Sequence, residues 1–405
     1  MRILIPTIGS RGDVQPFIAL AQGLERAGHT ATLATHPIMK ALVESYGVTF
    51  ATIGPDIDLA QEAAAIRLRS RNPAVGLVRG MRFGLAMVEQ SHADILALCQ
   101  GADLVVVSAQ SAAGKNEADQ LNLPYLSVTL MPWAIPWDDP KRPLFKRVAY
   151  GALDGLISLI TTLPLNRMRK RQGLPPAGKE GFSSPRLNLV PVSPAVYTPN
   201  PQWELRHRIV GYWFVEESSG WQPPADLQAF LDQGEPPLVV SLGAMSLGEV
   251  DALESANLFV DAIQQAGVRA VVQGWDVGMQ QLTLPPSIYA AGPVPHSWLL
   301  PHCSGIVHHG GFGITSAGLR AGIPALVIPH IADQFYWGQH LHQLGVGLPP
   351  ITRPKLNTTS LAAALDELAR ADQLREAAES LSEQIRAEKG VDHAVNLIEG
   401  EFEGA

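Results

Sequence analysis

The chain has 405 residues, of which 46% are hydrophobic and 17% charged, so it has a globular composition and is long enough for two domains. Its net charge is −8. Residues 1–200 contain 20 basic and 15 acidic side chains, and residues 201–405 contain 10 basic and 23 acidic side chains. The sequence lacks the dense stripe of basic and aromatic residues that is typical of nucleic-acid-binding proteins. The first ten residues hold too short an apolar run for a signal peptide, and the two cysteines lie far apart, so we expect a cytoplasmic protein without disulfides.

Short apolar runs alternate with helix-length amphipathic stretches in both halves of the chain. In the first half a helix is expected from Pro16 to Gly28, and the strand candidates are residues 2–7, 30–35, 104–109 and 123–130. In the second half they are residues 237–243, 269–274, 305–310 and 324–330. Strands that are apolar throughout are typical of parallel sheets covered by helices on both faces. The repeated alternation predicts an α/β protein with two doubly wound domains.

The segment between the two sets of strands, residues 190–224, is rich in proline and aromatic residues and has little helical period. We interpret it as the linker region, with the boundary near residue 215. The prediction is a first domain of residues 1–214 and a second of residues 215–385. Residues 386–405 are expected to form a terminal helix that packs back on the first domain.

A glycine-rich loop follows one of the buried strands of the second half. Residues 310–313 read GGFG, and a helix is expected directly after them. Glycines allow a close backbone approach to a ligand, and a helix N-terminus offers free N–H groups and a positive dipole end, which suits a diphosphate. His309 and Thr315 are the side chains placed to donate to its oxygens. Two alternatives are a dinucleotide site, which lacks its acidic residue after the next strand, and a tight strand–helix turn without a ligand.

The residues around this loop resemble the nucleotide-sugar-binding signature of the family 1 glycosyltransferases, which have the GT-B fold. The matching parts are residues 308–311 (HHGG), Gly313, residues 320–324 (RAGIP) and residues 333–334 (DQ). Residues 9–29 resemble the start of the bacterial natural-product and sterol glucosyltransferase branch. The resemblance implies two Rossmann-like domains that face each other across a cleft. The first would bind the acceptor and the second the nucleotide sugar, with uridine diphosphate glucose as the expected donor.

The same resemblance implies roles for residues of the second domain. His309 would contact the diphosphate, the loop around Val294 would bind the base, and Asp333 with Gln334 would bind sugar hydroxyls. The full set of donor candidates is Ser246, Val294, His296, His309, Gly311, Gly313, Thr315, Asp333 and Gln334. Two positions depart from the pattern. Ile314 and Ala244 stand where a hydroxyl residue is usual, so Thr315 and Ser246 would take over these contacts.

Two further observations bear on this donor site. Asp333 has an alternative interpretation as the N-cap of the helix that follows it. Seven of the twelve histidines lie between residues 296 and 342 without the spacing of a compact zinc site, so no metal is expected.

The loop after the first strand contains Asp13 three residues before Pro16, where relatives have a histidine at the same spacing. The aspartate that supports this histidine in many relatives is replaced by Ala109 and Gln110. Asp13 is therefore a candidate general base for an inverting transfer, with burial raising its pKa. The alternative is a helix N-cap without catalytic role. Ser10 and Gly12 are expected to touch the diphosphate.

Large apolar residues in the first domain suggest a lipophilic acceptor such as a sterol, polyketide or flavonoid. The acceptor candidates are Met81, Phe83, Met131, Trp133 and Trp137, and core packing is the alternative for those on the helix. Residues 155–171 are apolar with a basic end, which fits either peripheral membrane contact or a core helix with a solvated end. Three further hypotheses are a non-catalytic sugar-nucleotide-binding relative, a glycopeptide or glycolipid acceptor, and a nucleotide-sugar epimerase.

Overall fold

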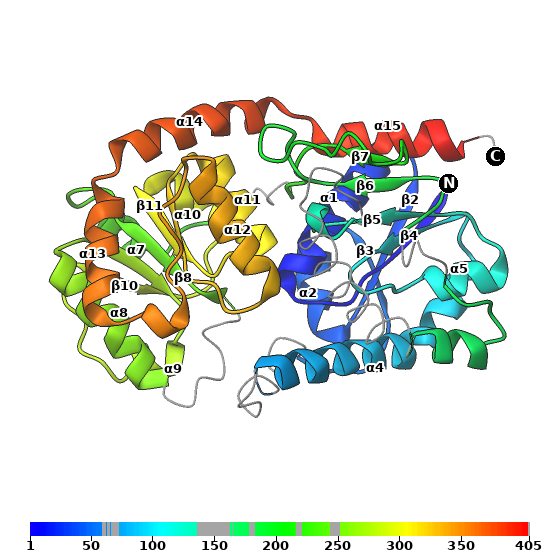
Figure 1. Cartoon of the computed structure of the whole chain (residues 1–405), viewed down its shortest axis with the longest axis horizontal. Helices are drawn as coiled ribbons and strands as arrows, with labels where there is room; N and C mark the ends of the chain where they lie inside the picture. Colours follow the sequence, from blue (N-terminus) through cyan, green and yellow to red (C-terminus); the bar gives the residue numbers. More distant parts are fainter. Residues whose placement is uncertain are drawn as a thin grey trace, which may run out of the picture. The chain divides into compact units, whose positions relative to one another are not determined.

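The computed structural model describes residues 1–58, 62, 65, 73–135, 163, 165–177, 183–215, 221–243 and 252–403. Two compact units make up the chain (Figure 1). Of the described residues, those within 1–58, 73–215 and 389–403 belong to the first unit, and residues 62 and 65 together with those within 221–388 form the second. The chain therefore passes from the first unit to the second and returns for its last helix.

The first unit contains a seven-stranded parallel sheet with the order β3-β2-β1-β4-β5-β6-β7. The strands are β1 (Arg2–Pro6), β2 (Thr30–Thr35), β3 (Thr49–Thr52), β4 (Leu104–Ser108), β5 (Tyr125–Val128), β6 (Asn188–Val190) and β7 (His207–Ile209). The helices are α1 (Arg11–Arg26), α2 (Lys40–Ser45), α4 (Pro73–Cys99), α5 (Lys115–Leu121) and α15 (Gly390–Phe402), with short turns η1 (Pro37–Met39) and η2 (Pro132–Ala134). The four predicted strands are present. Sequence reasoning missed β3, β6 and β7, because each has only three or four residues and no continuous apolar run.

The second unit contains a five-stranded parallel sheet with the order β10-β9-β8-β11-β12. Its strands are β8 (Leu238–Ser241), β9 (Ala270–Gln273), β10 (Ile288–Ala291), β11 (Gly305–His308) and β12 (Ala325–Val327). Its helices are α7 (Ala225–Leu231), α8 (Ala252–Ala266), α9 (Asp276–Met279), α10 (His296–Leu299), α11 (Phe312–Ala321), α12 (Ala332–Gln343), α13 (Thr358–Ala369) and α14 (Asp372–Ala387), with short turns η4 (Leu300–His302) and η5 (Arg353–Lys355). The prediction of two parallel, helix-covered sheets is confirmed.

Strand order decides where each unit can hold a ligand. In the first sheet the order reverses between β1 and β4, and in the second between β8 and β11. Ligands of such sheets bind outside the carboxyl ends of the strands at this switch point. The loops after β1 and β11, which carry Asp13 and His309, therefore start at the switch points of their own units.

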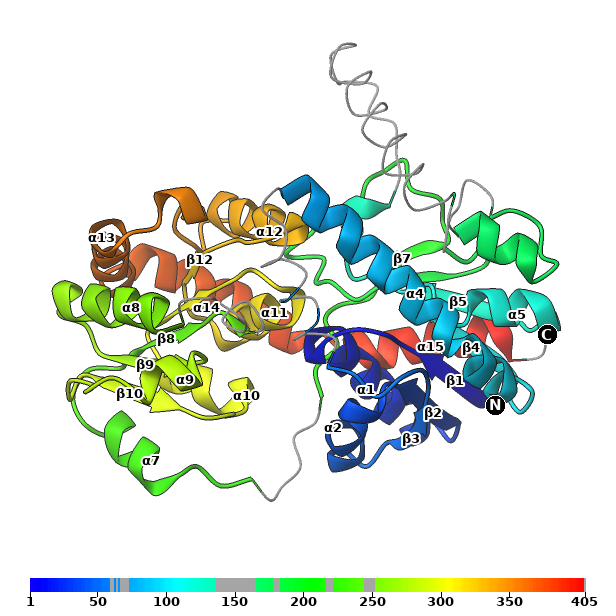
Figure 2. The same ribbon diagram turned by 90° about the horizontal axis from the view of Figure 1, so that it is seen from below.

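The terminal helix α15 is attached to the first unit and lies along it in both ribbon views (Figures 1 and 2). It packs against α1, where Val391 and Val395 fill the space beside Gly23. Its first residue, Gly390, accepts a hydrogen bond at its carbonyl oxygen from Trp213 Nε1 at 3.2 Å. A Cβ at Gly390 would lie 2.5 Å from the carbonyl oxygen of Tyr212. Backbone atoms therefore leave room only for glycine where this helix begins.

Substituting Gly390→Ala should lower the free energy of unfolding by about 1–3 kcal/mol, because the backbone of residues 211–212 cannot move aside without strain. Gly400→Ala is the matched control on the same helix, since a Cβ there would meet no atom within 4 Å and alanine favours a helix. Urea unfolding followed by circular dichroism measures both variants. Equal stability of the two would contradict the proposed packing constraint.

A partly buried ion pair joins α4 to α5. His92 Nδ1 lies 2.5 Å from Glu117 Oε1, and the Glu117 side chain is 2% exposed. The bond to Glu117 raises the pKa of His92, against the opposing effect of burial. Since the folded pKa lies above the unfolded value of about 6.5, this stabilisation is complete below that pH and is lost as the pH rises through the folded pKa.

The free energy of unfolding of the wild-type chain should therefore fall as the pH rises from about 6.5 through the raised pKa of His92, and His92→Gln should reduce this fall. Urea titrations of both proteins at a series of pH values measure the difference. Parallel pH profiles of the wild type and His92→Gln would show that the pair does not stabilise the fold in its charged form.

Candidate functional site

The loop after β1 leads directly into α1, which begins at Arg11 and not near Pro16 as predicted. Ser10 is the N-cap, with extended backbone angles. Its backbone N–H and its hydroxyl donate to Asp13 Oδ2 at 2.8 and 2.9 Å. This capping box stabilises five helical residues before Pro16, and the proline removes only the N–H that would bond to the carbonyl of Gly12. Arg11, Gly12 and Asp13 thus form a helical turn.

The expectation that Asp13 is the N-cap is wrong, because it is the third helical residue and closes the capping box from the other side. Both of its hydrogen bonds end on Oδ2, and none of the described residues donates to Oδ1. Burial raises the pKa of Asp13, and the bonds from Ser10 act in the opposite direction. A Cβ at Gly9 would lie 2.5 Å from Asp13 Cβ, so the loop backbone packs directly on this side chain.

Capping and base chemistry therefore do not exclude each other at Asp13. One carboxylate oxygen holds the helix start, and the other is left for a proton acceptor role. The raised pKa makes this carboxylate a stronger base than an exposed one.

The neighbouring loop, after β4, carries Ala109 and Gln110 in place of a carboxylate. The amide oxygen of Gln110 is placed to accept from the backbone N–H groups of Leu130 and Met131, at 2.8 and 3.3 Å. This residue therefore ties the loop after β4 to the chain after β5. Its side chain thus has a structural role at the position where the family resemblance implied a carboxylate.

The predicted acceptor residues are spread over two elements of the first unit. Phe83 is half-buried on α4, and Met131 and Trp133 are half-buried at η2, directly after β5. Met81 lies on α4, but its side chain is outside the described part, as is Trp137. Met87, one turn along α4 from Phe83, is buried, which agrees with the core-packing alternative for that position.

In the second unit the strand β11 ends in a buried histidine that shapes the glycine loop. His308 Nδ1 accepts a hydrogen bond from the backbone N–H of Gly310 at 3.0 Å. Burial lowers the pKa of His308 to about 3, so the ring is a neutral acceptor. Gly310 has φ +86°, and a Cβ there would lie 2.8 Å from Val327 Cγ1 and 2.9 Å from the carbonyl oxygen of Gln334. Only glycine fits this position.

His309 follows at the start of the loop, with its ring packed between two glycines. A Cβ at Gly243, which follows β8 and has φ +54°, would lie 3.1 Å from His309 Cε1. A Cβ at Gly311 would overlap Nε2 of the same ring. The two strands at the switch point thus hold His309 from both sides. Sequence reasoning missed Gly243, although a glycine directly after a buried strand was the available signal, and the predicted Ser246 lies outside the described residues.

The helix that follows, α11, has no side-chain cap, because its N-cap is Gly311. Phe312, Gly313 and Ile314 occupy its first turn, where backbone N–H groups lack helical acceptors. The positive end of the helix and these donors suit an anion such as a diphosphate. Thr315 is 2% exposed, and its hydroxyl has no hydrogen-bond partner among the residues that the structure describes. Its phosphate contact stays a prediction.

Asp333 and Gln334 lie in the first turn of α12, and the residue that caps this helix differs from the expected one. Ile331 is the N-cap, so the expectation that Asp333 caps this helix is wrong. Gln334 does so instead, since its Oε1 accepts from the backbone N–H groups of His330 and Ile331 at 2.8 and 3.2 Å. Its side-chain NH₂ donates to none of the described residues. Asp333 is half-buried in the first turn of α12.

The predicted base loop is held by a residue that sequence reasoning missed. Gln273, at the end of β9, donates to the carbonyl oxygen of Gly292 at 3.2 Å. Its Oε1 lies 3.2 Å from His296 Nε2. The signal was a polar residue at the end of an apolar strand. Val294 is buried between these two anchor points. Trp298 packs against Trp221 and His302, as the packing interpretation required.

Within the described ranges, one group has the composition of a metal site. The candidate ligand atoms of His29, Glu399 and Glu403 lie within 4.8 Å of one another, where α15 meets the start of β2. This group belongs to the first unit and contains none of the histidines between residues 296 and 342. None of the helices in the described parts combines the length and the apolar content needed to cross a bilayer.

Comparisons with known proteins match both units. Residues 3–135 match the glycosyltransferase family 28 N-terminal domain, and residues 269–398 match the erythromycin biosynthesis protein CIII-like C-terminal domain. The whole chain is 31% identical to a sterol 3-beta-glucosyltransferase of Aspergillus terreus over 431 residues and 32% identical to one of Komagataella phaffii over 439 residues. It spans only 30% and 35% of the length of these relatives.

Solved structures show the same fold over almost the whole chain. The glycosyltransferase of kitacinnamycin aligns with a TM-score of 0.77 at 20% identity and 99% coverage of both chains. Glycosyltransferase VinC in complex with DTDP aligns with a TM-score of 0.73 at 22% identity and 100% coverage of both. These matches support the family 1 glycosyltransferases as the family of the chain, and the chain has their two-domain GT-B fold.

Proposed function

We propose that this chain is an inverting glycosyltransferase that moves a hexose from a nucleotide diphosphate sugar to a hydroxyl of a lipophilic small molecule. The observation that carries the proposal is a pair of unused groups at the two switch points. These are Asp13 Oδ1 in the first unit and the uncapped N-terminus of α11 beside His309 in the second. The names of the sterol 3-beta-glucosyltransferase relatives support a glucosyl group and a sterol-like acceptor.

The second unit would hold the donor. The N–H groups in the first turn of α11 and the His309 ring would face the diphosphate and stabilise the negative charge that develops when it leaves. Backbone groups around Val294, fixed through Gln273, would bind the base. We propose uridine diphosphate glucose from the family resemblance, whereas two structural neighbours are described as complexes with thymidine diphosphate or DTDP. Asp333 and the NH₂ group of Gln334 would bind the sugar hydroxyls.

The first unit would hold the acceptor and its base. Asp13 Oδ1 would take the hydroxyl proton as the acceptor oxygen attacks the anomeric carbon of the donor. The bond from that carbon to the diphosphate oxygen would break in the same displacement, which inverts the configuration. Ser10 would act as a positioning residue, because its hydroxyl already donates to Asp13. Gly12, in the first turn of α1, stays a candidate for a diphosphate contact through its backbone. Phe83, Met131 and Trp133 are proposed acceptor contacts.

Asp13→Asn should lower kcat by roughly 10²- to 10⁴-fold, because the amide keeps the shape of the side chain and cannot accept the proton. The rate of glucosyl transfer from uridine diphosphate glucose to a sterol, followed by mass spectrometry, measures the loss. In the wild type, kcat should fall with decreasing pH through the raised pKa of Asp13, since only the carboxylate is the base. Wild-type transfer rates for both Asp13→Asn and Asp13→Ala would contradict the proposal that Asp13 is the general base.

Ser10→Ala distinguishes positioning from simple capping. Loss of the Ser10 hydroxyl removes a bond that lowers the pKa of Asp13, so the acid limb of the pH–rate profile should move to higher pH. A lost cap alone would reduce stability by about 1 kcal/mol and leave that limb in place.

Gln334→Glu should raise KM for the nucleotide sugar roughly 3- to 10-fold, the effect of one lost hydrogen bond, while the carboxylate still caps α12. Gln334→Met is the matched variant that loses both groups, so it should also lower the thermal midpoint. Initial rates over a range of donor concentrations give KM. An unchanged KM in Gln334→Glu would assign Gln334 to capping only.

A further inference from the structure

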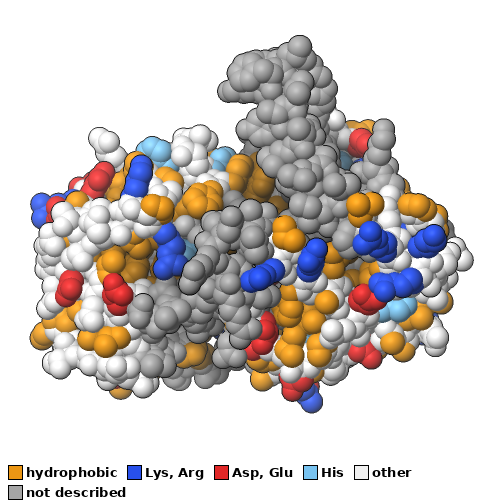
Figure 3. Space-filling view, turned by 60° about the horizontal axis from the view of Figure 1, so that its bottom comes forward, with side chains coloured by type: hydrophobic (Ala, Val, Ile, Leu, Met, Phe, Trp, Pro, Cys, Tyr) orange, Lys and Arg blue, Asp and Glu red, His pale blue; other side chains and the backbone are white. Residues whose placement is uncertain are grey.

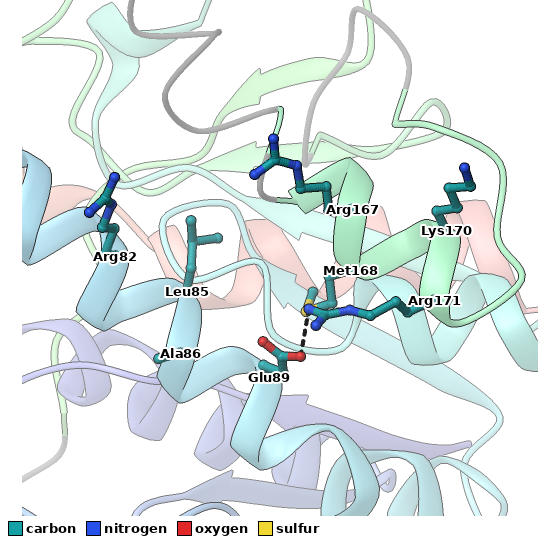
Figure 4. A pocket seen from close by; sticks show the side chains of 8 residues that line it. All are labelled: Arg82, Leu85, Ala86, Glu89, Arg167, Met168, Lys170 and Arg171. Carbon is teal, nitrogen blue, oxygen red and sulfur yellow. Dashed lines mark ion pairs between the residues drawn. The ribbon is translucent and has the colours of Figure 1, made fainter.

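A groove lies on the first unit between α4 and the helical residues 165–171 (Figure 4). Its volume is about 670 Å³. We call it the basic groove, and its lining residues are Arg82, Leu85, Ala86, Glu89, Arg167, Met168, Lys170 and Arg171. Four of these side chains are cationic and one is anionic. Nothing in the proposed transfer reaction uses them.

Packing fixes the direction of the basic side chains from residues 165–171. Leu165 and Met168 are buried against Val88 of α4. Arg169 is also buried, where it donates to Asn116 Oδ1 at 2.7 Å and lies 2.9 Å from Asp119 Oδ2. With these side chains turned inward, Arg167, Lys170 and Arg171 are exposed. The cations therefore lie on a helix face that is held in place, and not on a freely solvated end.

The side of the basic groove formed by α4 also presents its residues on a single helix face. Arg82, Leu85, Ala86 and Glu89 follow one another at helical intervals and share one face. Leu85 lies between Arg82 and Arg167 in Figure 4, and Arg171 reaches across to Glu89, with NH2 at 2.6 Å from Oε1. No ion pair with Arg82, Arg167 or Lys170 is formed by any described residue. Three positive charges thus remain over an apolar floor of Leu85, Ala86 and Met168.

This combination selects an anionic amphiphile. A phosphate group can be held by two guanidinium groups and an ammonium, and apolar atoms next to the phosphate can cover the half-buried Leu85 and Ala86. Lys and Arg side chains with hydrophobic side chains between them are gathered over the α4 side of the first unit in the space-filling view (Figure 3). An exposed face of this kind can contact the surface of a membrane, whereas an enclosed pocket binds single molecules.

We propose that the basic groove binds the headgroup of an anionic phospholipid and docks the first unit on a bilayer. The stretch 155–171, named from sequence as a membrane contact, is described only at residues 163 and 165–171, and the groove adds the α4 wall that sequence reasoning did not consider. Ile8, in the loop before Ser10, packs on the same cluster of Val88, Leu165 and Met168. The groove thus lies one layer of side chains from the loop of the proposed base. Docking there would bring a membrane-dissolved acceptor to the first unit. Only this delivery role rests on the proposed function.

The test is flotation of the full chain with vesicles of phosphatidylcholine alone and of phosphatidylcholine mixed with phosphatidylglycerol. The wild type should bind only the mixed vesicles, and less as salt is added, because counterions screen the charges. The triple variant Arg82→Gln, Arg167→Gln, Lys170→Gln should bind roughly 100-fold more weakly, since each basic residue near an anionic surface contributes about 1 kcal/mol. Transfer to a water-soluble acceptor should be unchanged.

The matched control removes three exposed cations elsewhere, Lys40→Gln, Arg208→Gln and Lys355→Gln, and should bind like the wild type. Equal binding of the groove variant and the wild type would overturn the proposal, as would an equal loss in the control. Binding of glycerol phosphate without binding of mixed vesicles would assign the groove to a soluble phosphate and overturn the docking role. Vesicle binding is measured without turnover, so inactivity of the chain as a transferase would leave this result intact.

Discussion

Each helix that follows a parallel strand begins with backbone N–H groups that need partners, and this requirement organises the candidate site. In α1, α5 and α12 the third helical residue provides the partner: Asp13, Glu117 and Gln334 each use one side-chain oxygen to accept from the backbone before the helix. The second polar atom of each side chain is then free for another task. For Glu117 this task is visible, since its other oxygen pairs with His92. We infer that Asp13 and Gln334 divide their polar atoms in the same way.

In α11, by contrast, the N-cap is a glycine. Its first N–H groups have no side-chain partner, and the glycines around them leave room for a close approach. Glycine is required at position 310 by the neighbouring backbone of Gln334, and positions 243 and 311 leave space for the His309 ring. The same residues that remove a side-chain cap therefore place a donor side chain next to the free helix end. Such an arrangement is expected where a ligand, and not the protein, completes the cap.

The long helix α4 connects the interior of the first unit with its surface. Its inner side carries Val88 and His92, which contact the helical residues 165–171 and α5. Its outer side carries Arg82 and Glu89 of the basic groove. Because one rigid helix holds both sets, a ligand in the groove and the loop around Ile8 share the same support. The proposed docking surface is thereby coupled in position to the proposed acceptor side.

The sequence by itself determined the parallel sheets, the glycine loop and the spacing of Asp13 to Pro16, because these depend on residues that are neighbours in the chain. Apolar runs predict buried strands, and a GGFG stretch after such a run predicts a close approach to a ligand. What only the tertiary structure decided depends on distant residues. The start of α1 is decided by the Ser10–Asp13 bonds, and the capping role in α12 passes from Asp333 to Gln334 because of how the chain turns before it. Gly243 meets His309, Gln273 holds the base loop and Gly390 fits against the backbone before Trp213 only once strands far apart in the chain are paired. No local pattern records such contacts, because they arise from the register of the sheets and the packing of helices on them.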